Sequence, residues 1–147
     1  MPRASTYVCE VPLRAGLHEV AVLGSRFEAA RQLFNAVLGE ALRRLARMRR
    51  DPAFDQAKAM PRGSSSKDAT PLQKVQAQAR REAFAALRRK HGFREYDLHQ
   101  HPSLGKGCWI REHLDINTAQ KVATRAFRAV ERYSFGQAGK PRFKRYG

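Results

Sequence analysis

The sequence predicts a mainly α-helical domain preceded by one β-strand. Three stretches of the chain repeat apolar residues at spacings of three and four, which is the period of a helix with one buried face. Strand-favouring residues are concentrated in residues 6–13, and no second segment of this kind follows. A length of 147 residues is typical of a single domain with a core of its own.

The predicted strand lies within an N-terminal unit of residues 1–15. Residues 6–13 are rich in β-branched and aromatic side chains and are closed by Pro12 and Gly16. A single strand leaves its backbone N–H and C=O groups without partners, so it needs a neighbouring strand. Because the sequence offers no second strand, we expect that neighbour to come from outside this chain.

The first predicted helix runs from about residue 18 to residue 50. Gly24 costs about 1 kcal/mol relative to alanine, and Ser25 with Glu28 has the spacing of a capping box, so a start at Ser25 is the alternative. Arginines opposite the apolar stripe build a positive surface near the C-terminal end, where cations suit the helix dipole. The stripe itself consists of Val20, Leu23, Phe27, Ala30, Phe34, Val37, Ala41, Leu45 and Met48.

The middle of the chain is predicted to contain a loop, a second helix and a set of short turns. Residues 51–70 include prolines and three consecutive serines, which is loop composition. Thr70 and Pro71 predict the N-cap and the first position of the second helix, and Gly92 is placed to end it. Prolines and glycines interrupt the apolar pattern of residues 93–113, so short helical turns are expected there.

Asp115 is the expected N-cap of the last helix. Lys121, Arg125, Arg128 and Arg132 recur at helical spacing on one of its sides. After it, residues 136–147 are predicted to be extended, basic and aromatic. The inward face is predicted to consist of Ile116, Ala119, Val122, Ala123, Ala126, Phe127, Val130 and Tyr133.

The chain carries 29 lysines and arginines against 13 acidic residues, a formal net charge of +16. Residues 1–24 hold two basic and two acidic residues, so residues 25–147 carry the whole excess. Nucleic acid is the leading candidate partner, because covering phosphates with cations releases counterions. No stretch of about 18 uncharged apolar residues is present and no secretory signal is visible, so we expect a cytoplasmic protein without a membrane partner.

The usual catalytic and metal-binding motifs are missing from the sequence. There is no phosphate-binding glycine loop, no His-Glu-x-x-His helix and no nucleophile elbow. A histidine-rich interval matches no common zinc spacing; it contains His91, His99, His101, Cys108 and His113. We therefore expect neither catalysis nor a cofactor in this chain alone.

Two short motifs resemble one protein family. Residues 31–38 read Arg-Gln-Leu-Phe-Asn-Ala-Val-Leu, and residues 139–144 read Gly-Lys-Pro-Arg-Phe-Lys. Together with the strand and the helix that contains Gln120, they resemble the N-terminal part of TnpB, the RNA-guided nuclease of insertion sequences that is also described as a transposase. The type V CRISPR nucleases are its relatives. The resemblance covers essentially the whole chain.

The resemblance implies three parts: a wedge strand (1–15), a helical recognition lobe (16–135) and a return segment (136–147) that leads back into a wedge-type barrel. The other barrel strands, the RuvC-like catalytic acids and the zinc ribbon of the family would follow residue 147. Mg²⁺ and Zn²⁺ are therefore expected only in the downstream part of a longer parent. The implied partners are guide RNA, target DNA and the remainder of the same nuclease.

The resemblance also implies roles for single residues. Arg31 and Asn35 match the helix motif and are expected to organise the lobe. Gln120 is the first candidate for base contact, because an amide pairs well with an adenine edge; nearby candidates are Asn117, Lys121 and Thr124. Arg142 and Lys144 are expected on the backbone of guide RNA or heteroduplex. The other candidates for nucleic-acid contact are Arg43, Arg44, Arg47, Arg125, Arg128, Lys140 and Arg145.

Two other hypotheses stay open on the sequence alone. An independent basic DNA-binding or ribosome-associated RNA-binding protein would have the same charge, and it would bind any polyanion with similar affinity. A stand-alone metal-dependent nuclease needs carboxylates that converge on ions about 4 Å apart, and the sequence offers no persuasive set.

Overall fold

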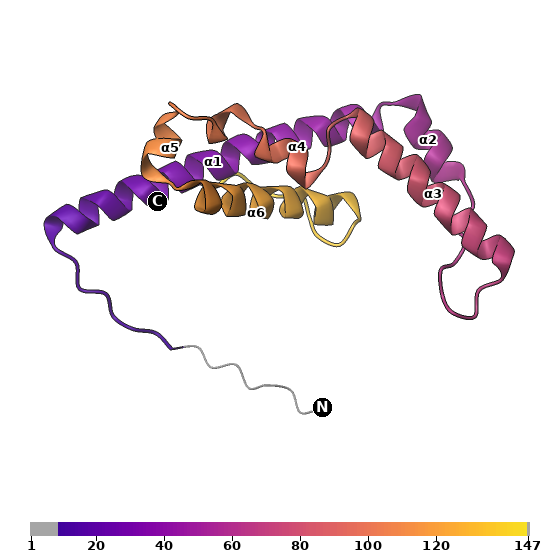
Figure 1. Cartoon of the computed structure of the whole chain (residues 1–147), viewed down its shortest axis with the longest axis horizontal. Coiled ribbons are helices and arrows are strands. Elements are labelled where there is room, and N and C mark those ends of the chain that lie inside the picture. Colours follow the sequence, from indigo (N-terminus) through magenta and orange to yellow (C-terminus); the bar gives the residue numbers. More distant parts are fainter. Residues whose placement is uncertain (1–8, 147) are drawn as a thin grey trace.

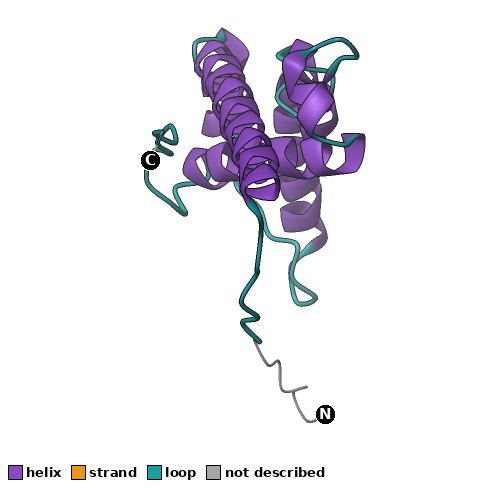
Figure 2. Cartoon of the chain, turned by 90° about the vertical axis from the view of Figure 1, so that its left-hand side faces the viewer, coloured by secondary structure: helices purple, strands orange, loops and turns teal. Residues whose placement is uncertain are grey.

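The computed structural model describes residues 9–146, and these residues form six α-helices and one short 3₁₀-helix without a β-strand (Figure 1, Figure 2). The predicted mainly helical fold is confirmed. The elements are α1 (Leu17–Arg49), α2 (Pro52–Ala59), α3 (Pro71–Lys90), α4 (Glu95–His99), η1 (Pro102–Leu104), α5 (Trp109–His113) and α6 (Ile116–Ser134).

The predicted N-terminal strand lies partly outside the described residues. Residues 6–8 belong to the part that is not described, and residues 9–13 have no regular secondary structure. Val11 and Leu13 are both 78% exposed, so the described chain covers little of either side chain. Completion of this strand by a barrel beyond the chain stays a prediction.

Helix α1 is continuous over 33 residues and contains Gly24, so the alternative start at Ser25 is wrong. The Glu19 carboxylate accepts a hydrogen bond from the Gly16 N–H at 2.6 Å, which satisfies a free donor at the helix start. Glu28 pairs with Arg31 in the next turn instead of closing a capping box, at 2.6 Å between carboxylate and guanidinium.

The hydrophobic core lies between α1 and α6, which run side by side in the same direction (Figure 1). The short elements α4, η1 and α5 cover this pair. Fully buried alanines on α6 leave room for the large side chains of α1. Phe93, which follows α3, packs on Phe127 of α6 with 5.3 Å between the ring centroids. The buried residues of α1 are Ala29, Leu33, Val37, Leu38, Ala41, Leu45 and Met48.

The apolar stripe predicted for α1 is confirmed only in its C-terminal half. Its last four members, from Val37 to Met48, are buried, whereas Phe27 is 71% exposed. The first turns of α1 extend past the start of α6, so this end of α1 is not covered by α6 (Figure 1). Ala30 and Phe34 of the predicted stripe are partly buried and pack against the core, and Ala29 and Leu33 are the first fully buried residues of α1.

Helices α2 and α3 form a hairpin that projects from one end of the α1 and α6 pair (Figure 1). The loop expected over residues 51–70 is helical at Pro52–Ala59. The Asp51 carboxylate accepts a hydrogen bond from the Ala53 N–H at 3.0 Å, and Pro52 at the first helical position has no N–H to leave unpaired. The same residues that suggest a turn therefore start a helix.

Helix α3 begins and ends where the sequence predicts. Thr70 and Gln73 exchange hydrogen bonds of 2.9 Å and 3.3 Å in a capping box. Gly92 follows the helix with φ at +60°, a conformation that glycine adopts without strain. The short turns predicted for residues 93–113 are also confirmed, as α4, η1 and α5. Within residues 9–146, no helix is both long and apolar enough to cross a bilayer.

Candidate nucleic-acid interface

Four cations of α6 form what we call the α6 basic face: Lys121, Arg125, Arg128 and Arg132. Spacings of four, three and four residues place them on one side of the helix. This side lies opposite the buried Ala119, Ala123 and Val130, and all four side chains are exposed. None of the four has an ion-pair partner among residues 9–146, so their charge is available to an external anion. Asn117 is exposed at the start of the same side.

A second side of α6 is occupied by the protein itself. The Thr124 hydroxyl donates to the Glu95 carboxylate at 2.7 Å and lies 2.9 Å from Nε2 of His99, which places it against α4. Glu131, seven residues further on, pairs with Arg88 of α3 at 2.6 Å. Gln120, four residues before Thr124, shares this side and is half-buried. Thr124 is thus engaged in packing, whereas no described residue bonds to the Gln120 amide.

The candidate arginines of α1 surround one acid, Glu40. Its carboxylate lies 2.5 Å from the Arg43 guanidinium, 2.7 Å from that of Arg44 and 3.7 Å from that of Arg47. The Arg44 hydrogen bond, followed by the charges of the three arginines, holds the pKa of Glu40 below its usual value. One acid cannot neutralise three cations, so this cluster has a net positive charge.

Arg43, Arg44 and Arg47 differ in how exposed their side chains are. The Arg44 side chain is only 19% exposed, and its Nη1 also donates to the Gly92 carbonyl at 2.7 Å. Arg44 therefore ties α1 to the end of α3. The side chains of Arg43 and Arg47 are 73% and 62% exposed and extend into solvent, where they can meet phosphates.

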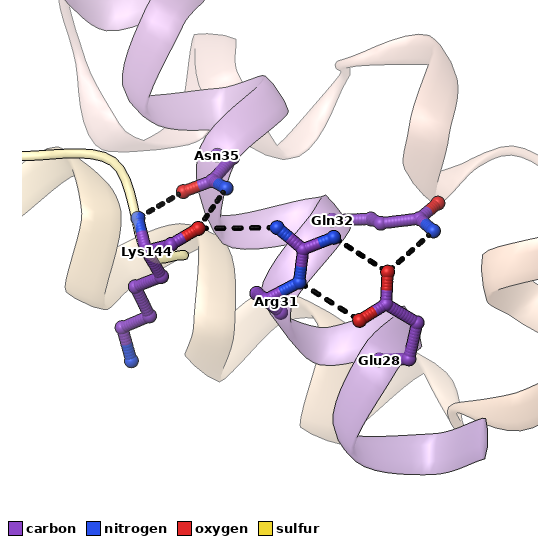
Figure 3. A network of polar contacts seen from close by, with 5 residues as sticks. All are labelled: Glu28, Arg31, Gln32, Asn35 and Lys144. Carbon is purple, nitrogen blue, oxygen red and sulfur yellow. Dashed lines mark hydrogen bonds and ion pairs between the residues drawn. The ribbon is translucent and has the colours of Figure 1, made fainter. Parts of the chain in front are cut away.

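The return segment is held on α1 chiefly by Asn35, with Arg31 beside it (Figure 3). Its Oδ1 accepts a hydrogen bond from the Lys144 N–H, and its Nδ2 donates to the Lys144 carbonyl, both at 2.8 Å. Nη1 of Arg31 donates to the same carbonyl at 3.1 Å. Asn35 thus pairs with the backbone of Lys144 as a neighbouring strand would, although the two residues are 109 positions apart.

The surroundings of Asn35 fix Arg31 and the side chain of Lys144. The Glu28 carboxylate accepts hydrogen bonds from Arg31 and Gln32, which lowers its pKa to about 2. Nζ of Lys144 lies 4.6 Å from the ring centroid of Phe34, a cation–π distance. Arg31 and Asn35 thus join α1 to the return segment, and their role in a recognition lobe stays a prediction. The other cations of the return segment are exposed and have no hydrogen-bond partner among the described residues: Lys140, Arg142 and Arg145.

The structure also brings together arginines that the sequence reasoning did not select. They are Arg80, Arg81 and Arg88 of α3, and the available signal was the spacing of seven residues between Arg81 and Arg88, which is two helical turns. With Arg62 of the preceding loop they line a cavity of about 430 Å³, which we call the α3 cavity. Phe135 after α6 also lines it, and spacing within α3 does not reveal this.

Three histidines of the histidine-rich interval contact neighbouring polar groups of the described chain: His91, His99 and His101. His91 Nε2 lies 2.7 Å from the Asp51 carboxylate, and Nδ1 of His101 accepts the Ser103 N–H at 3.2 Å. Among residues 9–146, no group of three or more histidine, cysteine or acidic side chains is arranged to hold a metal ion. Comparisons with protein-family models, curated proteins and solved structures gave no match to this chain.

Proposed function

We propose that this chain binds nucleic acid, and that it does so as the N-terminal portion of an RNA-guided DNA-targeting protein of the TnpB type. The observation that carries the binding proposal is the α6 basic face, four exposed cations without a carboxylate partner in the described chain. Unpaired cations repel one another, and a phosphate backbone removes that repulsion.

The length of the α6 basic face suits a nucleic-acid backbone. Lys121 and Arg132 are eleven residues apart, which corresponds to about 16 Å along a helix. One strand of a duplex carries about five phosphates over that length. The face therefore matches a short stretch of backbone, and it reads shape and charge instead of base sequence.

The TnpB part of the proposal has separate support. The two motifs that carry the resemblance, residues 31–38 and 139–144, contact each other through Asn35 and Lys144. Motifs that form one structural unit are a stronger resemblance than two unrelated short matches. Guide RNA and target DNA are the partners that follow, with Gln120 proposed for base contact and Arg142 for backbone contact.

Binding as a function of salt tests the first part. Affinity for duplex DNA, structured RNA and single strands is measured by fluorescence anisotropy over a range of salt concentrations. Arg125→Ala and Arg128→Ala are each expected to lower the slope of log Kd against log salt by about one. Lys106→Ala is the matched control, because it removes an exposed cation that is not part of α6 and lies between η1 and α5. Equal slopes for all three variants would show that the face is not the binding surface.

The choice of nucleic acid tests the second part. A preference for a structured guide RNA supports the TnpB proposal, whereas equal affinity for every polyanion leaves only an independent basic binding protein. In the complete ribonucleoprotein, Gln120→Ala is expected to reduce recognition of the target-adjacent motif. Arg142→Ala is expected to weaken binding with little dependence on sequence. The reverse pattern would exchange the two proposed roles.

A further inference from the structure

The α3 cavity combines cations, hydroxyls and aromatic rings without an acid in its wall. The loop before α3 supplies Arg62, Ser64 and Ser65, α3 supplies Arg81 and Phe84, and Phe135 closes the far end. The volume of about 430 Å³ falls in the range of about 300–1,000 Å³ that small-ligand pockets have.

The loop wall of the cavity is fixed in place. Gly63 has φ at +60°, and a side chain there would collide with the backbone of Gln73 and Ala77. The Ser64 N–H donates to the Gln73 carbonyl at 3.1 Å, which ties the loop to α3. Only glycine permits this close approach, so the side chains on either side of it are held over α3.

The two ends of the cavity differ in chemistry. At the loop end, Arg62 and Arg81 have no ion-pair partner among the described residues, and Nη2 of Arg81 donates to the Ser65 hydroxyl at 2.6 Å. The remaining guanidinium N–H groups of Arg81 are free for an anion. Arg80 contributes less, because its guanidinium donates to backbone carbonyls at the end of α2. The loop end is therefore suited to a phosphate.

The far end is suited to a flat aromatic group. Phe135 lines the cavity and is 62% exposed, so much of its ring is accessible to a bound group. The Arg88 guanidinium lies 5.5 Å from its ring centroid, and the Glu131 carboxylate at 2.6 Å neutralises that arginine. A base that stacks on Phe135 would cover the exposed ring.

From this juxtaposition we propose that the α3 cavity binds one nucleotide unit, with its phosphate at Arg62 and Arg81 and its base against Phe135. The nucleotide is either an unpaired residue of a nucleic-acid strand or a free mononucleotide. The site shares no residue with the α6 basic face, so it extends the proposed function without depending on it.

Equilibrium binding of four probes tests the proposal: adenosine monophosphate, adenosine, inorganic phosphate and a single-stranded RNA octamer. The monophosphate is expected to bind more tightly than adenosine or phosphate alone. Arg81→Gln keeps a donor to Ser65 but loses the charge, and it is expected to weaken binding of the monophosphate about tenfold. Phe135→Leu keeps an apolar wall without a ring, with an expected loss of about fivefold or more.

Arg89→Gln is the matched control, since Arg89 is an exposed arginine of α3 that does not line the cavity. If the Arg81 and Phe135 variants weaken binding of the octamer alone, the ligand is an unpaired residue of a strand. If they weaken binding of both the octamer and the monophosphate, the cavity also binds a free nucleotide. Binding of inorganic phosphate as tight as that of the monophosphate, or equal effects of Arg81→Gln and Arg89→Gln, would overturn the proposal. Duplex DNA is titrated in parallel, so that a failed cavity with intact duplex binding is distinguished from failure of the proposed function.

Discussion

Replacement of Asn35 by alanine tests how the return segment is held. The change removes both 2.8 Å hydrogen bonds between the amide and the Lys144 backbone. A single hydrogen bond contributes about 0.5–1.5 kcal/mol net, and values near the low end apply here because both partners are accessible to water. We therefore expect docking of the segment to weaken by about 1–2 kcal/mol, which corresponds to about a 5–30-fold change in its equilibrium constant.

Amide hydrogen exchange, followed by NMR, measures this effect directly. The Lys144 N–H is bonded to Asn35 Oδ1, so its protection factor reports how often the segment opens. Protection is expected to fall about 5–30-fold in Asn35→Ala. Amides of the α1 and α6 core are expected to keep their protection, because the core does not include the return segment.

Gln32→Ala is the matched control for this variant. Gln32 is also a side-chain amide on α1, but it bonds only to Glu28, at 2.9 Å. Its removal is expected to leave the Lys144 amide as protected as before. The reasoning fails if Lys144 exchanges at the same rate in Asn35→Ala and the wild type, or if Gln32→Ala has the same effect.

Two further predictions concern the core and the α2 cap. Leu33→Ala is expected to lower the free energy of unfolding by about 2–5 kcal/mol, because Leu33 is fully buried. Phe27→Ala, at an exposed position, is expected to change it by no more than about 0.5 kcal/mol. Urea unfolding measures both, and equal losses would contradict the packing at this end of α1. Hydrogen bonds from Lys90, then from His91 and the Ala53 N–H, hold the pKa of the Asp51 carboxyl well below its ordinary value of 3.8. This stabilisation is present above the unfolded pKa and is lost as pH falls through the lower folded pKa. Asp51→Asn keeps the capping oxygen but loses the charge. The Tm of this variant is expected to lie below that of the wild type, and the difference is expected to shrink as pH falls from about 5 to about 2. A difference that does not change with pH would show that the ion pairs of Asp51 do not contribute to stability.

The helix ends were predictable because their signals are local. Thr70 with Pro71, Asp115 and Gly92 mark ends by hydrogen bonds or backbone conformations within a few residues. Asp51 and Pro52 also have the residue types of a helix start, but the prolines and serines of residues 51–70 favoured the prediction of a loop. Which turns of α1 are buried was not predictable, since the apolar spacing continues through Phe27 past the point where α6 begins to cover the helix.

The candidate interface also has one part that the sequence predicts and one part that it does not. The α6 basic face follows from the helical spacing of its four cations and of the alanines opposite them, so the sequence suffices to predict it. The engagement of Arg44 with Gly92 and of Thr124 with Glu95 does not follow, because each pair comes from different elements.

By itself, the sequence determined a basic, mainly helical chain, the ends of most of its helices and one row of exposed cations. Tertiary structure alone decided that Asn35 holds Lys144 and that Arg62, Arg81 and Phe135 surround one cavity. The physical reason is range. Helix period and caps act over three or four neighbouring residues, whereas these contacts join residues up to 109 positions apart, which only the packing of distant elements brings together.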